Sequence, residues 1–221
     1  MNWRFVFLRL AGKLAPSTTL FEVQEESRRF YRAITHFEDL GRRKREVILR
    51  DYLKVVFVRH PLVRLLSAYR MLADGNTVLA NLFKMLKTQN GGTVSLKSFV
   101  GFIIKSYDPS KGVLTREKRL GDDHWAEYFQ LCDPCSVQYD IIGHLEEKED
   151  ASNFLKLISA NFTFPSLESV NDTAARHRVH GDTAQKMEES YAEIEEADLR
   201  RLLEVFRTDA QLFGYDLTKM D

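Results

Sequence analysis

The chain has 221 residues, enough for one sizeable domain and few for two. Lysine plus arginine and aspartate plus glutamate each number 32, so the zero net charge disfavours a general nucleic-acid-binding protein. Two cysteines exclude a disulfide-rich secreted module, and fifteen phenylalanines with eight tyrosines exclude wholesale disorder. The longest uncharged run in the first segment, Phe5–Leu8, is too short for a signal peptide or a membrane span.

The first third of the chain is predicted to be helical. Residues 2–12 form an apolar block that ends at Gly12, which favours a helix packed against a core lying elsewhere. Phe21–Phe37 and Asp39–Leu53 are predicted as two polar helices joined by a turn. The second contains the basic run Arg42–Arg45, which we interpret as a solvated helix face.

The sharpest local pattern lies between residues 54 and 73. Val55–Val58 is a continuous β-branched and aromatic run, typical of a strand buried on both faces of a parallel sheet. Pro61 fits the first position of a helix, where its missing N–H costs nothing. The pattern predicts a strand, a tight turn holding Arg59 and His60, and a helix. The residues predicted to form the buried stripe of this helix are Leu62, Leu65, Leu66 and Tyr69.

Further helices follow from apolar spacing alone. Amphipathic helices are expected over Thr77–Leu86 and Leu96–Ile104, on either side of an Asn-Gly-Gly turn at 90–92. A third is expected over about 147–158. The core face of a C-terminal helix is predicted to be Leu199, Leu202, Leu203 and Phe206.

One further strand and two irregular stretches complete the prediction. Tyr139–Leu145 is predicted as a second buried strand. Tyr107–Asp123 is predicted as an exposed loop because it is polar and contains proline and glycine. Phe162–Asp182 is predicted to be irregular. The chain has no internal repeat, so we expect a single domain.

The predicted turn at residues 59–60 has the geometry of an anion site. The free N–H groups and the dipole of a helix amino end both favour an anion there. Arg59 at the turn, with Arg64 and Ser67 on one helix face, adds donors suited to phosphate oxygens. The alternative is that the arginines merely flank a core helix. The sequence has no GxxxxGK[ST] loop, which disfavours an ordinary nucleotide triphosphatase.

Cysteines and histidines supply the other candidates for chemistry. Cys132 and Cys135 form a CxxC pair without the further ligands that zinc needs, so a short disulfide or two packed thiols are favoured over a metal site. His124, in a loop beside acidic residues, is either a general base or a surface or structural histidine. His177 and His180 lie in an arginine-rich stretch and either touch an anion or are solvated.

Two long motifs resemble one enzyme family. Residues 57–70, FVRHPLVRLLSAYR, closely resemble the 3′-phosphate-binding segment of the Golgi carbohydrate sulfotransferases, the group of chondroitin, dermatan and GalNAc 4-O-sulfotransferases and the HNK-1 sulfotransferase. Residues 124–146 match the family pattern HW…LCxPC…YDxIGxxE, which Glu146 completes. The ending Phe213-Gly-Tyr-Asp216 is also similar to the family, and order and spacing agree from residue 2 to about 216.

The resemblance implies an α/β fold with a P-loop-like parallel sheet flanked by helices, apparently missing its first strand. It implies one sulfotransferase domain over residues 1–221. The implied reaction moves a sulfuryl group from 3′-phosphoadenosine 5′-phosphosulfate to a sugar hydroxyl of a glycan or proteoglycan, without a metal. A different reading is a catalytically inactive relative that serves as a binding or interaction module.

The resemblance also implies roles for individual residues. Arg59 and Ser67 would bind the 3′-phosphate of the cofactor, and the segment between them, with His60 and Arg64, would shape that site. Asn2 would belong to the loop that binds the 5′-phosphosulfate. His124 is our candidate for the base that deprotonates the sugar hydroxyl.

The N-terminus departs from the family pattern. Asn2-Trp3-Arg4 matches the end of the 5′-phosphosulfate motif, so the lysine and the strand that the family places before it would fall upstream of Met1. We expect a reading frame started at an internal methionine, in preference to a fragment or a real truncated product. We also expect the literal chain to be unstable or inactive, because an unpaired apolar strand is an aggregation hazard.

The resemblance implies a cellular location as well. The relatives are membrane-anchored Golgi proteins with a lumenal catalytic domain. Asn161 and Asn171 stand in N-glycosylation acceptor motifs, which suits a lumenal glycoprotein.

Overall fold

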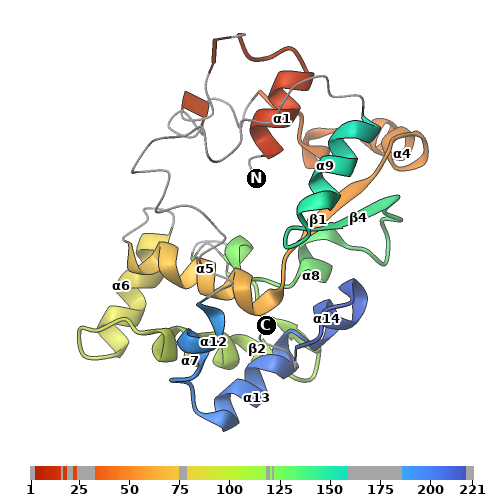
Figure 1. Ribbon diagram of the computed structural model, residues 1–221. Coiled ribbons are helices and arrows are strands. Elements are labelled where there is room, and N and C mark those ends of the chain that lie inside the picture. Colours follow the sequence, from red (N-terminus) through yellow and green to blue (C-terminus); the bar gives the residue numbers. More distant parts are fainter. Residues whose placement is uncertain are drawn as a thin grey trace.

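The structure is a computed structural model that describes residues 3–15, 17–18, 22–23, 33–74, 79–117, 120, 122–158 and 186–217. A body of helices lies on one side of a small parallel sheet, and α1, α4 and α9 lie on the other side (Figure 1). The mixed fold with a parallel sheet agrees with the α/β prediction. Residues 162–182, predicted to be irregular, lie outside the described part.

The main core is built from helices that surround α5 (Pro61–Ala73). The predicted stripe of α5 is confirmed, with three leucines buried and Tyr69 half-buried against the core. Tyr191 donates a hydrogen bond of 3.0 Å to the Leu62 carbonyl and so joins α12 to the start of α5. The other helices of this core are α6 (Ala80–Gln89), α7 (Leu96–Ser106), α12 (Met187–Tyr191) and α13 (Glu196–Val205).

Two strands far apart in the sequence form the parallel pair. β1 (Val55–Val58) and β4 (Ile141–His144) pair in parallel, with Val55 opposite Ile141 (Figure 1). At the amino end, Asp140 accepts a hydrogen bond of 2.7 Å from the Lys54 backbone and lies 2.8 Å from its ammonium group. At the carboxyl end, the Leu145 N–H donates to the Val58 carbonyl at 2.9 Å. The register is therefore fixed at both ends.

Both strands were predicted correctly as strands, but their predicted burial was wrong. In β1, Val56 and Val58 are buried while Val55 and Phe57 are half-buried, and in β4 the side chain of Ile142 is 44% exposed. The physical reason is that the described sheet has only two strands, so each strand has a neighbouring strand along one edge only.

Helix α9 (Lys148–Leu157) covers one face of the strand pair. The Phe57 ring packs edge-on against Phe154 of α9, with ring centroids 5.7 Å apart. The same ring lies so close to Gly143 of β4 that a β-carbon there would collide with it. The glycine of the second motif is thus required by packing.

The expected N-terminal helices are only partly confirmed. Helix α1 (Trp3–Leu10) lies within the predicted range 2–12, and α4 (Arg42–Asp51) matches the second polar helix. The helix predicted over Phe21–Phe37 is wrong at its end, because residues 33–36 are not helical and η1 (Phe37–Asp39) is a short 3₁₀ turn. Most of its remaining residues lie outside the described part.

Helix ends explain the other boundary differences. The helix predicted over Thr77–Leu86 is α6, which begins and ends three residues later. The Asn90 side chain donates to the Leu86 carbonyl at 2.7 Å, so the turn itself closes the helix. Helix α7 starts where predicted, because Ser95 and Ser98 form a reciprocal capping box.

The stretch predicted as an exposed loop contains three short regular elements in its described residues, so the prediction holds only in part. β2 (Tyr107–Asp108) and β3 (Val113–Leu114) form a small antiparallel pair, and η4 (Asp122–His124) follows. Leu114 and Asp122 are buried. The polar composition misled the prediction at Asp122, because Arg116 pairs with its carboxylate inside the fold.

Two short helices close the site region. Asp209 of α14 (Arg207–Phe213) accepts hydrogen bonds from the Tyr128 and Phe129 N–H groups, at 2.6 and 3.0 Å, and so caps the amino end of α8 (Tyr128–Cys132). Phe213 packs on Val56 and Val58 of the sheet. Among the described residues, no helix is long and apolar enough to cross a membrane.

Candidate cofactor and base site

Arg59 lies at the carboxyl end of β1, immediately before the amino end of α5. Its side chain is buried, at 9% exposure. Burial lowers the pKa of Arg59, and the negative charge of Glu146 is the main opposing influence. A partly desolvated guanidinium interacts strongly with an anion, so the residue suits phosphate recognition.

His60 is the unusual group of this turn. It is also 9% exposed, and both ring nitrogens are buried without a hydrogen bond of good geometry to any described residue. Burial lowers the pKa of His60, against smaller opposing effects of Glu146 and the Asp216 backbone. Buried polar atoms normally have partners, so an imidazole without a well-formed hydrogen bond has a ring nitrogen available to a polar ligand.

Glu146 connects this turn to the end of the second strand. One carboxylate oxygen accepts a hydrogen bond of 2.8 Å from the His60 backbone N–H, and the other accepts one of 3.1 Å from the Tyr215 hydroxyl. The Tyr215 ring lies between His60 and His144, edge-on to both, with centroid distances of 5.3 and 5.2 Å. Glu146 and Tyr215 received no role from the sequence, although Glu146 completes the second family motif and Tyr215 lies within the third.

Ser67 lies two turns into α5 and is half-buried. It follows Arg64 by three residues, so both project from one face of the helix. The structure thus places Arg59, His60 and Ser67 on one strand–turn–helix unit, as the sequence predicted. That they bind a cofactor stays a prediction.

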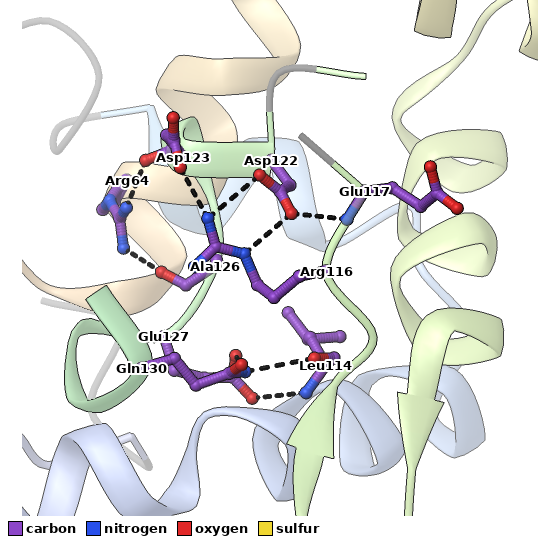
Figure 2. Close-up of polar contacts among 9 residues, drawn as sticks. All are labelled: Arg64, Leu114, Arg116, Glu117, Asp122, Asp123, Ala126, Glu127 and Gln130. Atoms are coloured by element: carbon purple, nitrogen blue, oxygen red, sulfur yellow. Dashed lines mark hydrogen bonds and ion pairs between the residues drawn. The ribbon is translucent and has the colours of Figure 1, made fainter. Parts of the chain in front are cut away.

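Arg64, in the first turn of α5, contacts the segment that contains His124. Its guanidinium donates hydrogen bonds to the carbonyls of Ala126 and Asp123, at 2.5 and 2.7 Å (Figure 2). The same group lies over the Tyr128 ring, 4.3 Å from its centroid. Arg64 therefore holds the segment that contains His124.

His124 ends the 3₁₀ turn η4 and is half-buried. Its neighbour Trp125 is buried in the main core, edge-on to Phe99 and Phe102 at 5.5 and 6.2 Å. Burial and then the positive charge of Arg64 lower the pKa of His124, while Asp123 opposes this. A neutral imidazole near neutral pH can accept a proton, as a general base must.

The His124 segment is also held by Arg116, from the chain that precedes it. Arg116 donates to Asp122 at 2.7 and 3.1 Å and to Asp123 at 2.5 Å, and Asp122 also accepts from the Glu117 N–H (Figure 2). The segment that carries the predicted base is thus fixed by side chains from several elements.

Glu127 anchors the end of the same segment inside the fold. Its carboxylate is fully buried, accepts from the Leu114 N–H at 2.9 Å and contacts the Gln130 amide (Figure 2). Burial raises the pKa of Glu127. The contact ties η4 and α8 to strand β3.

The remaining candidates are less informative. Asn2, His177, His180, Asn161 and Asn171 lie outside the described residues. The two cysteines are free thiols, Cys132 half-buried and Cys135 exposed, so the short disulfide is not formed. In the described ranges, no group of three or more His, Cys, Asp or Glu side chains could hold a metal ion.

Comparison with known proteins decides the family. The sequence profile described as "Sulfotransferase family" matches residues 1–216. The chain belongs to the sulfotransferase family. The resemblance drawn from its motifs is thereby confirmed.

Individual relatives are carbohydrate sulfotransferases. The chain is 29% identical to carbohydrate sulfotransferase 8 of Mus musculus, over 97% of this chain and 51% of that protein. It is 27% identical to carbohydrate sulfotransferase 14 of Danio rerio, over 98% and 57%, and 28% identical to carbohydrate sulfotransferase 10 of Rattus norvegicus, over 97% and 61%. The chain therefore spans little more than half the length of these relatives. No solved structure matches it.

Proposed function

We propose that this protein transfers a sulfuryl group from 3′-phosphoadenosine 5′-phosphosulfate to a hydroxyl of a glycan or proteoglycan. The observation that carries the proposal is the turn after β1, where buried Arg59 and buried His60, whose ring nitrogens lack a well-formed hydrogen bond, precede the amino end of α5. These residues fit a phosphate, because a buried cation, a ring N–H and helix N–H groups are all donors to anionic oxygens. The donor supplies a sulfuryl group attached to a phosphate leaving group.

Within this site, each residue has a separate task. Arg59 and Ser67 bind the 3′-phosphate by charge-assisted hydrogen bonds, and His60 donates to the same anion through its ring. Arg64, in the first turn of α5, donates to the Asp123 and Ala126 carbonyls and is not counted among these phosphate ligands. Asn2 lies near the 5′-phosphosulfate, an assignment that rests on the sequence motif alone.

His124 serves as the general base. It accepts the proton of the sugar hydroxyl as that oxygen bonds to sulfur and the bond between sulfur and the phosphate oxygen breaks. The products are a sulfate ester and adenosine 3′,5′-bisphosphate, so atoms and charge balance. The lowered pKa of His124 keeps the imidazole able to take this proton near neutral pH.

We also propose that the chemistry takes place in the Golgi lumen, in a membrane-anchored glycoprotein. The acceptor motifs at Asn161 and Asn171 support this location. Expression in a secretory pathway should give a product that an endoglycosidase shortens, and the Asn161→Gln and Asn171→Gln variants should each lose one step of that shift. An unglycosylated product would contradict the lumenal assignment.

The cofactor assignment is tested by binding of adenosine 3′,5′-bisphosphate, measured by calorimetry. Adenosine 5′-monophosphate, which lacks the 3′-phosphate, should bind at least about tenfold more weakly, because a charged hydrogen bond contributes about 1.5–3 kcal/mol. Arg59→Ala and Ser67→Ala should each weaken binding of the bisphosphate and should not change binding of the monophosphate. Arg43→Ala, on the exposed face of α4, is the matched control for loss of one positive charge.

Two outcomes would contradict the proposal. Equal affinity for the two nucleotides, or unchanged bisphosphate affinity in both Arg59→Ala and Ser67→Ala, would remove the cofactor assignment. Transfer of radiolabelled sulfate to a glycan, lost in His124→Ala, would support the enzyme. Nucleotide binding without any transfer would favour the inactive binding module.

A further inference from the structure

Arg64 lies between the two parts of the proposed site. It precedes Ser67 by one turn of α5, and its guanidinium reaches the chain on both sides of His124. The acceptors are the Asp123 carbonyl, directly before His124, and the Ala126 carbonyl, two residues after it. One side chain thus fixes the segment at both ends.

The terminal nitrogens of Arg64 are engaged by the protein itself. Nη1 donates to Ala126 and Nη2 donates to Asp123, at 2.5 and 2.7 Å, so each makes one hydrogen bond within the fold. The planar group also stacks over the Tyr128 ring at 4.3 Å. An arginine held in this way is poorly placed to wrap around a phosphate, because its forked donors point at carbonyl oxygens.

The neighbours of His124 show what Arg64 adds. Arg116 binds the side chains of Asp122 and Asp123, and Glu127 binds strand β3, so these contacts join the segment to the chain that precedes it. Of Arg64, Arg116 and Glu127, only Arg64 belongs to α5, the helix that also carries Ser67 (Figure 2). It is therefore the link between the proposed phosphate site and the proposed base.

We infer that Arg64 is a positioning residue for His124, which it holds at a fixed place relative to α5 through the Asp123 and Ala126 carbonyls. This inference rests on the proposed function, in which His124 is the base. Two consequences separate it from direct cofactor binding. The positive charge next to the imidazole disfavours protonation of His124, and the affinity for the 3′-phosphate does not depend on the Arg64 donors.

The test compares Arg64→Met and Arg64→Lys with the unchanged chain. Arg64→Met should raise the pKa of His124, followed by NMR of the imidazole signals, which His124→Gln assigns among the six histidines. Arg64→Lys keeps the charge but cannot reach both carbonyls, so the pKa of His124 should stay low. In both variants the amides of Trp125 and Ala126, which bond to the Asp122 carbonyl, should exchange faster with solvent. Arg43→Met is the remote control and should change neither readout.

Binding of adenosine 3′,5′-bisphosphate gives the decisive contrast. Affinity in Arg64→Met should stay within about threefold of the unchanged chain, whereas Arg59→Ala should lose about tenfold or more. A loss in Arg64→Met as large as in Arg59→Ala would overturn the inference and make Arg64 a cofactor ligand. Unchanged amide exchange and an unchanged His124 pKa would overturn it too.

The two proposals fail separately. If the unchanged chain does not bind the bisphosphate, the proposed function fails, while the pKa and exchange measurements still decide the role of Arg64. If Arg64→Met does not fold, as judged by circular dichroism, the exchange rates of Arg64→Lys decide, because that variant keeps the charge and most of the volume.

Discussion

The two regions of the proposed site differ in how their polar groups are satisfied. At the carboxyl end of the sheet, Arg59 is buried and His60 has two buried nitrogens without a good partner. In the His124 segment, Arg64, Arg116 and Asp122 make hydrogen bonds to other protein groups. Proteins rarely leave buried polar atoms unpaired, so the first region fits the proposed ligand site, whereas the polar groups of the second are already satisfied within the protein.

The His124 side of this comparison predicts the largest effect on stability. Trp125→Ala should lower the free energy of unfolding by about 3–5 kcal/mol, because it removes a buried indole packed edge-on against Phe99 and Phe102. Chemical denaturation measures this loss. Phe37→Ala, at a ring that is 39% exposed, is the control and should change stability by less than about 1 kcal/mol. Equal losses of unfolding free energy in the two variants would show that Trp125 does not stabilise the core more than an exposed ring does.

Glu146 allows a second test, because its carboxylate joins the turn at His60 to Tyr215 near the C-terminus. Glu146→Ala should weaken binding of adenosine 3′,5′-bisphosphate by about tenfold, since the His60 turn and Tyr215 both lose their acceptor. Tyr215→Phe removes only one of these hydrogen bonds and should have a smaller effect. Calorimetric titration distinguishes the two. Wild-type affinity in Glu146→Ala would show that the turn needs no support from the second strand.

A substitution at His60 should change the free energy of unfolding least, and in the direction opposite to Trp125→Ala. His60→Phe keeps a planar ring and removes two buried nitrogens without good partners, so the free energy of unfolding should be unchanged or rise by up to about 1 kcal/mol. Binding of adenosine 3′,5′-bisphosphate should weaken in the same variant. A stability loss with unchanged binding would reverse the assignment of this turn as a ligand site.

The same substitution changes the pH dependence of stability. The folded state lowers the pKa of His60 below its ordinary value of 6.5, so the unfolded chain takes up the proton first as the pH falls. The stability that depends on a neutral His60 is therefore fully present above about pH 6.5, and it is lost as the pH falls toward the pKa of His60 in the folded state. Denaturation between pH 7 and pH 5 should show a shallower fall in His60→Phe. The remaining slope includes His124, whose pKa is lowered as well.

Local patterns were sufficient where one segment decides its own structure. The strand at 55–58, the Pro61 helix start and the buried leucines of α5 were all predicted from spacing and residue type. These signals are local, so no knowledge of distant contacts was needed.

Contacts across the chain could not be predicted in this way. The polar composition of residues 107–123 predicts an exposed loop, yet Asp122 is buried and pairs with Arg116. The two hydrogen bonds of Arg64 could not be predicted either, since their acceptors are backbone carbonyls that have no sequence signature. The pairing partner of a charged side chain is a property of the folded chain.

The contacts at the two ends of the strand pair have a consequence for folding. Lys54 with Asp140 and His60 with Glu146 both join residues 86 positions apart, so neither forms until a long loop has closed. Helices α5, α6 and α7 follow one another closely along the chain and can pack before that closure. The turn that carries Arg59 and His60 therefore depends on a long-range closure, and a nucleotide bound there would stabilise the closed, folded state.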